Sequence, residues 1–283
     1  GPDYNRAAEE IRRATGAASV FQPDAEPDRL GARVSELLEG ELELREAVEL
    51  GLLNSPVLQA SFHGVGMASA DRVQAGLLTN PSLNAVLRFP TSGGGTGFEG
   101  ALFGSLLDLW QVPDRERVAE EALEAHILQL AHEAALLAAE IRVAYIETVT
   151  ARNLVEIAAQ NRAIAENLVE LAEARLEAAA TTAIDANLAR LEMSATAVAL
   201  RDAELASGEA ARRLNALLGL PAGLDLRLGQ LPEPSSRALP SVEELERIAV
   251  ERRLDLRSAN AAVARAEAEL ERQRSLVWQK VDV

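Results

Sequence analysis

Residues 178–185 have the sequence AAATTAID, and they interrupt a long helical pattern. Before this stretch, apolar residues step by four and three in turn, in the heptad of a coiled-coil helix: Leu123, Ile127, Leu130, Ala134, Leu137, Ile141, Ala144, Thr148, Ala151, Val155, Ala158, Ala165, Val169, Ala172 and Leu176. After it, a second heptad runs through Ile184, Leu188, Leu191, Ala195, Val198 and Leu205. Because Thr and Asp favour caps and turns over helix interiors, the stretch predicts a turn between a long helix and a return helix.

The first of these helices is very long. We expect Pro113 to open it, because proline is tolerated in the first turn of a helix and Asp114 follows at the favourable end. From Asp114 to Ala178 it would measure about 97 Å at ~1.5 Å per residue, which is about three times the thickness of a bilayer core. A single globular domain cannot enclose it. A second apolar set on the same helix indicates that more than one face is buried: Ile157, Ile164, Leu168 and Leu171.

The segment before the long helix, residues 81–111, is predicted to form a β-hairpin. Apolar and polar residues alternate from Pro81 to Phe89, which indicates a strand with one apolar face. A Gly-rich loop follows, and then a second apolar run from Phe98 to Trp110. The loop lacks the Lys-Ser/Thr signature of a phosphate-binding loop. The apolar residues of this hairpin are Leu83, Ala85, Leu87, Phe89, Phe98, Leu102 and Trp110.

The remaining segments are shorter. Residues 1–41 carry several Pro and Gly residues and predict a linker with short helical pieces. Residues 42–80 predict a first helical segment, in which Ser55 ends one helix and caps the next. Residues 112–220 form the long helical hairpin, and residues 221–283 a connector that leads into a last helix capped by Ser241.

The last segment repeats an early one. When residues 42–84 are shifted by 198 positions they align without a gap, and LGLLNSPVL (50–58) falls on IAVERRLDL (248–256). The repeat predicts a duplicated unit of helix, hairpin, long helix and return helix. The second hairpin should begin near Trp278 to Val283. We therefore expect one complete unit and the first helix of another, either because the chain is truncated or because a partner chain supplies the rest.

Composition and charge exclude several functions. The formal net charge of −16 argues against nucleic-acid binding, which needs a basic face; it serves either solubility or an acidic channel lumen. The absence of cysteine excludes disulfides and thiol chemistry. The three histidines, His63, His126 and His132, do not form a metal-ligand pattern, and the carboxylates lack a nucleophile. We expect no enzyme activity, cofactor or metal.

Four short motifs, taken in order and spacing, resemble the TolC-like outer-membrane efflux protein family. They are residues 44–58, QAGLLTNPSL at 74–83, RRLNALLGLP at 212–221 and RRLDL at 252–256. The opening GPDY also resembles the stretch that follows the lipidated cysteine in lipoprotein members of the family. The resemblance covers most of residues 42–283.

The resemblance implies a homotrimer in the outer membrane of a Gram-negative bacterium, with a periplasmic extension. The fold it implies is mainly α with a small β part: very long coiled-coil helices of an α-barrel, and a β-hairpin that contributes to a membrane β-barrel in contact with lipid. The channel would passively export substrates delivered by an inner-membrane pump through a periplasmic adaptor protein. The exported substrate is not encoded in any motif.

The resemblance also places the periplasmic tip, where adaptors dock and the pore is gated. The residues are Ala179, Ala180, Thr181, Thr182 and Asp185. Ala179 stands where the family usually has Gly, although Ala pays a cost at positive φ. Asp185 either caps the return helix or makes a contact that holds the tip shut, and Trp110 is either a membrane-interface anchor or a side chain packed where strand meets helix.

An alternative function is a soluble periplasmic coiled-coil adaptor or scaffold. Adaptors also carry long helical hairpins, but they flank them with domains rich in β structure. Deletion of residues 81–110 would separate the two functions, because a scaffold would tolerate the loss and a channel would no longer insert into a membrane.

Overall fold

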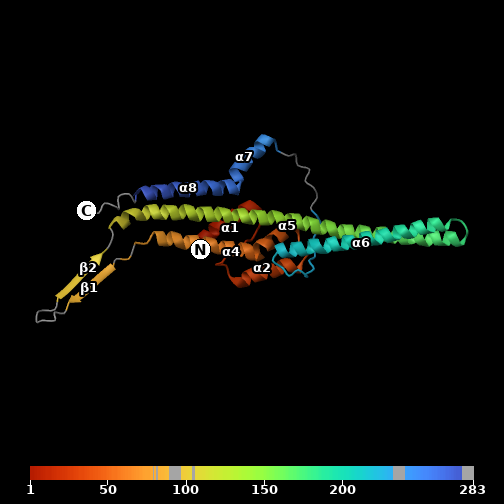
Figure 1. Cartoon of the computed structure of the whole chain (residues 1–283), viewed down its shortest axis with the longest axis horizontal. Coiled ribbons are helices and arrows are strands. Elements are labelled where there is room, and N and C mark those ends of the chain that lie inside the picture. Colours follow the sequence, from red (N-terminus) through yellow and green to blue (C-terminus); the bar gives the residue numbers. More distant parts are fainter. Residues whose placement is uncertain (79, 81, 89–96, 104–105, 232–239, 276–283) are drawn as a thin grey trace. The chain divides into compact units, whose positions relative to one another are not determined.

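The computed structural model describes residues 1–78, 80, 82–88, 97–103, 106–231 and 240–275. In these ranges helices dominate and one two-stranded antiparallel sheet accompanies them, which confirms the predicted mainly α fold with a small β part (Figure 1). The chain forms two compact units. The first contains the described parts of 1–10, 61–132 and 240–283, and the second those of 11–60 and 133–239.

The N-terminal segment is more regular than the expected linker. It forms helix α1, Pro2–Thr15, and helix α2, Pro27–Glu39. Both helices begin at a proline, and Gly16 follows α1 with a φ of 75°. Proline at the first helical position costs no hydrogen bond, so residues that punctuate the sequence here start helices and do not interrupt them.

The next segment is bent at the predicted position. Helix α3, Leu44–Asn54, ends at Ser55, and helix α4, Pro56–Ala75, begins one residue later. Ser55 has an extended backbone (φ −67°, ψ 118°), as a residue before proline usually does. Nearly the whole of α3 is buried, from Ala47 to Leu53.

The predicted hairpin is present, but it is shorter than expected. Strand β1, Ser82–Arg88, pairs with strand β2, Gly97–Phe103. Helix α5, Leu106–Glu177, starts directly afterwards, so Pro113 lies inside this helix and Trp110 belongs to it. The prediction that the second strand reaches Trp110 and that the helix opens at Pro113 was therefore wrong. A continuous apolar run has no periodicity that separates strand from helix.

Helix α5 has 72 residues, and much of its predicted heptad is buried, most densely between Leu123 and Thr148. Tyr145 is also fully buried there, and its Oη lies 2.8 Å from the carbonyl oxygen of Leu42 and 3.0 Å from that of Gly229. These contacts hold the chain before α3 and the connector after α6 against the same helix. The buried heptad residues are Leu123, Ile127, Leu130, Ala134, Ile141, Ala144, Thr148, Ala165 and Val169.

The return helix is α6, Ala183–Leu217. It runs beside the last part of α5 (Figure 1), where Arg190 pairs with Glu173 at 2.7 Å. Beyond its end, the side-chain amide of Asn54 donates to the carbonyl oxygens of Leu218 and Gly219, both at 2.9 Å. Two of the motifs that define the family resemblance thus meet in the structure.

The sequence repeat is confirmed as a repeat of structure. Helix α7, Val242–Arg252, and helix α8, Leu254–Ser275, follow the connector. The bounds of α7 are those of α3 shifted by the predicted 198 positions, and Arg253 repeats the backbone of Ser55 with φ −64° and ψ 115°. As predicted, Ser241 caps α7, with its hydroxyl accepting from the Glu244 amide at 3.2 Å.

Candidate functional site

The turn at residues 178–182 ends α5 in a Schellman motif. The amide of Ala180 donates to the carbonyl of Arg175 at 2.8 Å, and the amide of Ala179 donates to that of Leu176 at 3.0 Å. Such a motif requires a residue in the left-handed region, usually Gly. Here that residue is Ala179, with a φ of 53°. The strain expected from its sequence position is therefore real.

The same turn also begins α6. The Oγ1 of Thr182 accepts from the Asp185 amide at 3.3 Å, and Asp185 Oδ2 accepts from the Thr182 amide at 3.1 Å, which makes a reciprocal capping box. Oδ2 also accepts from the hydroxyls of Thr182 at 2.7 Å and Thr181 at 2.8 Å. Hydrogen bonds from Thr182 and Thr181 lower the pKa of Asp185. Asp185 thus caps the return helix, the first of its two predicted roles.

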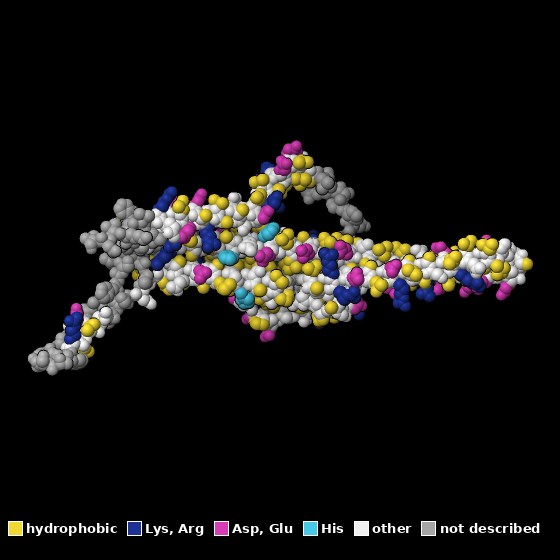
Figure 2. All heavy atoms as spheres, in the orientation of Figure 1, with side chains coloured by type: hydrophobic (Ala, Val, Ile, Leu, Met, Phe, Trp, Pro, Cys, Tyr) yellow, Lys and Arg dark blue, Asp and Glu magenta, His cyan; other side chains and the backbone are white. Residues whose placement is uncertain are grey.

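The predicted heptad of α6 faces away from α5. Its large apolar side chains are between 59% and 71% exposed, whereas Ala186, outside the heptad, is buried. Small residues therefore make the contact between the two helices. Figure 2 shows hydrophobic side chains lying exposed along the arm formed by α5 and α6. We call the following residues the α6 stripe: Ile184, Leu188, Leu191, Val198 and Leu205.

A second exposed stripe lies on α5. Its side chains are between 50% and 57% exposed. The Glu173–Arg190 pair joins the antiparallel helices α5 and α6. A residue some number of positions before Glu173 therefore lies at the same level along the arm as the residue that many positions after Arg190. Ile157, Ile164 and Leu171 therefore lie, to within a residue, at the levels of Leu205, Val198 and Leu191. We call the following residues the α5 stripe: Leu154, Ile157, Ile164, Leu168 and Leu171.

A shallow groove opens between the two helices next to the tip turn. Leu168 and Leu171 of the α5 stripe line it, and Arg175, Thr181 and Asp185 complete its end. Its lining is mostly apolar, with Arg175 and Asp185 near the turn and Glu192 farther from it. The predicted tip residues and the α5 stripe therefore share one surface.

The hairpin residues are only partly described. Leu87 lies opposite Phe98 in the register, and these side chains are 60% and 72% exposed; Ala85 lies opposite Gly100 and Leu83 opposite Leu102. Arg88 pairs with Glu99 at 3.0 Å across the strands. Phe89 lies outside the described residues. Trp110 does not belong to the hairpin; it lies on α5 and is 82% exposed.

Neither a metal centre nor a helical membrane span is found in the part of the chain that the structure describes. No group of three or more His, Cys, Asp or Glu residues is placed to hold a metal ion among those residues. None of the described helices combines the length and the apolar character needed to cross a bilayer.

The fold of this chain is similar to that of solved outer-membrane proteins. A membrane protein from Pseudomonas aeruginosa matches 82% of this chain and 57% of its own, with a TM-score of 0.65 and 21% identity. The outer membrane protein VceC from Vibrio cholerae matches 82% of this chain and 58% of its own, with a TM-score of 0.61 and 19% identity. The outer-membrane channel OprN matches 90% of this chain and 59% of its own, with a TM-score of 0.58 and 22% identity.

These similarities show the mainly α fold with a small β part that the sequence resemblance implied. The chain spans less than two thirds of the length of each of these three proteins. No protein-family model and no curated protein matches it.

Proposed function

We propose that this chain is part of a protomer of an outer-membrane channel, which passively exports substrates delivered by an inner-membrane pump and a periplasmic adaptor. The observation that carries the proposal is the pair of apolar stripes on the α5–α6 arm. Exposed apolar surface that runs the length of a helix marks a contact with another helix. The shared fold with outer-membrane channels supports the same function.

In this proposal the α5–α6 arms of neighbouring protomers pack side by side in a homotrimer. The α5 stripe of one arm meets the α6 stripe of the next, and both stripes present large side chains at matching levels. The acidic and polar faces that remain would line the duct or face solvent. The tip turn (Ala179, Ala180, Thr181, Thr182 and Asp185) would contact the adaptor.

The hairpin gives the proposal its membrane part. Leu87 and Phe98 lie directly opposite each other and are largely exposed, and residues opposite in an antiparallel pair share one face. In the proposed channel this face contacts outer-membrane lipid, while the helical arm extends into the periplasm.

Cysteine cross-linking tests the packing of the arms, because the sequence has no cysteine of its own. Ile164→Cys with Val198→Cys places one thiol in each stripe at one level. In the outer-membrane fraction of a Gram-negative host, we expect oxidation to link chains to one another. Ala163→Cys with Arg201→Cys is the control at nearly the same level outside the stripes, since both residues are exposed. Equal cross-linking of both pairs, or none in the stripe pair, would overturn the proposed packing.

Deletion of β1 and β2 (residues 82–103) tests the membrane part. A channel would lose its outer-membrane fraction, whereas a soluble periplasmic adaptor or scaffold would keep its folded helices and its location. Cell fractionation with circular dichroism of the purified protein separates these results. A deletion that leaves the membrane fraction unchanged would refute the channel.

A further inference from the structure

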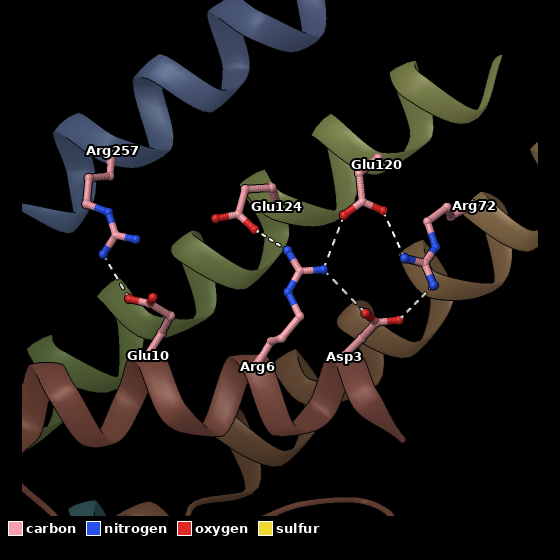
Figure 3. A network of polar contacts seen from close by, with 7 residues as sticks. All are labelled: Asp3, Arg6, Glu10, Arg72, Glu120, Glu124 and Arg257. Carbon is pink, nitrogen blue, oxygen red and sulfur yellow. Dashed lines mark hydrogen bonds and ion pairs between the residues drawn. The ribbon is translucent and has the colours of Figure 1, made fainter. Parts of the chain in front are cut away.

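The N-terminal helix α1 is attached to its unit through a network of charges. Asp3, Arg6 and Glu10 project from α1 toward three other helices of the same unit, α4, α5 and α8 (Figure 3). On the α8 side, Glu10 Oε2 lies 2.8 Å from Arg257 Nη1. The other contacts join α1 to α4 and α5 and join α4 to α5, apart from an ion pair between Arg6 and Asp3 within α1.

Toward α4, helix α1 presents a buried carboxylate. The side chain of Asp3 is 9% exposed, and its Oδ2 accepts from Ser69 Oγ at 2.7 Å and lies 3.4 Å from Arg72 Nη2. A carboxylate this buried needs hydrogen-bond donors. Both of these donors come from α4.

On α5, one carboxylate joins all three helices. Glu120 Oε2 accepts from Arg72 Nη1 of α4 at 2.9 Å, and its Oε1 accepts from Arg6 Nη1 of α1 at 3.2 Å. Arg6 Nη2 also donates to Glu124 Oε2 at 2.7 Å. The hydrogen bond from Arg72, with that from Arg6, lowers the pKa of Glu120. Without α1, Glu120 and Glu124 would stand as like charges four residues apart, which destabilises a helix.

The fit between α1 and α4 depends on a glycine. A Cβ on Gly66 would lie 2.2 Å from the hydroxyl oxygen of Tyr4, so only Gly leaves room for this ring. Tyr4 also lies 6.5 Å from Phe62, measured between ring centres. The other buried side chains of α1 in this unit are those of Ala7 and Ala8, which are small.

The helices joined by α1 are the two that carry the β-hairpin. The chain leaves α4 for β1, and α5 begins soon after β2. Near the strands, Arg115 Nη2 of α5 donates to the carbonyl oxygen of Leu77 at 3.0 Å, and a Cβ on Gly76 would lie 2.3 Å from Glu116 Oε1. The spacing of α4 and α5 at this point therefore sets the spacing of the hairpin's two ends.

We propose that α1 is a salt-releasable strap that closes the base of the β-hairpin by holding α4 against α5. When α1 is docked, Arg6 pairs with Glu120 of α5 and Asp3 pairs with Arg72 of α4, in addition to the direct pair between Arg72 and Glu120. When α1 is released, α4 and α5 both lose protection near the hairpin. Release by salt follows from exposure, since the side chains of Arg6 and Glu120 are each 43% exposed and that of Glu124 is 34% exposed. The strap does not depend on the proposed channel function.

Hydrogen exchange followed by mass spectrometry tests the strap in the intact chain. Between about 0.1 M and about 1 M NaCl the Debye length falls from about 10 Å to about 3 Å. We expect exchange to rise several-fold together in α1, in residues 66–78 and in residues 112–124. Exchange in α6 should not change. If α1 does not respond to salt, or responds alone, the strap is refuted.

Two variants release α1 by different routes. Arg6→Gln removes the positive charge of α1 that pairs with Glu120 and Glu124. Gly66→Ala displaces the Tyr4 side chain from its position against α4 without changing any charge. Both should raise exchange in residues 66–78 and 112–124 at low salt, and Tyr4→Phe should restore part of the protection in Gly66→Ala. Arg29→Gln, which removes an exposed ion pair within α2, is the control. Different exchange patterns in Arg6→Gln and Gly66→Ala, or the same pattern in the control, would overturn the proposal.

Discussion

Ala179 and Gly219 occupy the same position of the same motif, one after α5 and the other after α6. Each has positive φ, 53° and 67° respectively. Each is followed by an amide that donates five residues back at 2.8 Å, from Ala180 to Arg175 and from Leu220 to Asn215. The two turns thus form a natural pair for comparison, because one has a Cβ and the other does not.

Ala179→Gly should stabilise the tip. A residue with a Cβ in the left-handed region costs about 1–2 kcal/mol, and the additional unfolded-state entropy of glycine offsets about 0.5–1 kcal/mol of this. We expect a net gain of up to about 1 kcal/mol, measured by urea unfolding and by slower hydrogen exchange at residues 175–186. The reverse change, Gly219→Ala, should destabilise by more, because its Cβ would lie 2.6 Å from the Asn54 carbonyl oxygen. A less stable Ala179→Gly variant would contradict the strain.

The tip turn should loosen in acid. Three hydrogen bonds from Thr181 and Thr182 lower the pKa of Asp185. The stabilisation is therefore fully present above the ordinary aspartate pKa of about 3.9 and is lost as the pH falls through the lowered value. Hydrogen exchange at residues 178–186 should accelerate in that range. Asp185→Asn should abolish the pH dependence there, and Asp202→Asn on the exposed side of α6 should preserve it.

Tyr145→Phe should destabilise the second unit by about 1–3 kcal/mol, the cost of a buried polar group left without its partner. The Tyr145 hydroxyl contacts the carbonyls of Leu42 and Gly229, and burial raises its pKa. Urea unfolding measures the loss, and exchange should rise locally at residues 42–43 and 226–229. Tyr4→Phe is the matched control. An unchanged urea midpoint of unfolding would contradict the prediction, because it would mean that the carbonyls of Leu42 and Gly229 are satisfied by other donors.

Trp110 should report membrane contact if the chain belongs to a channel. Its side chain is 82% exposed at the start of α5, close in sequence to the end of β2. In a Trp278→Phe background, its fluorescence should shift to shorter wavelength on insertion into lipid vesicles, because tryptophan prefers the membrane interface. The same protein without β1 and β2 is the control. A shift in both proteins, or in neither, would speak against the interface role.

The sequence predicted the elements of the fold better than the direction in which they face. The heptad of α5 identified buried residues such as Leu123 and Ile141 correctly, because that face packs within the chain. The heptad of α6 identified an apolar stripe, yet Leu188 and Leu191 are exposed. Periodicity shows that a face is apolar and does not show which partner covers it. On α6 the buried residue toward α5 is Ala186. Alanine is a weaker signal than leucine in a heptad pattern, so this face was not recognised.

Two further differences have local causes. Pro27 was taken as a break, whereas it occupies the start of α2, where its missing amide is not needed. The boundary between β2 and α5 was placed too late because apolar residues recur from Phe98 to Trp110 without a clear strand or helix period. By contrast, the turn at residues 178–185 was predicted closely, since Thr182 and Asp185 supply both halves of a capping box.

The bend at Ser55 and its repeat at Arg253 show that an inherited shape can outlast its surroundings. Both residues have the same backbone angles, although α3 is almost wholly buried and α7 buries none of its residues within the described part of the chain. The residue at the bend also differs, and a proline follows only Ser55. The bend therefore depends neither on a following proline nor on burial of the helix before it.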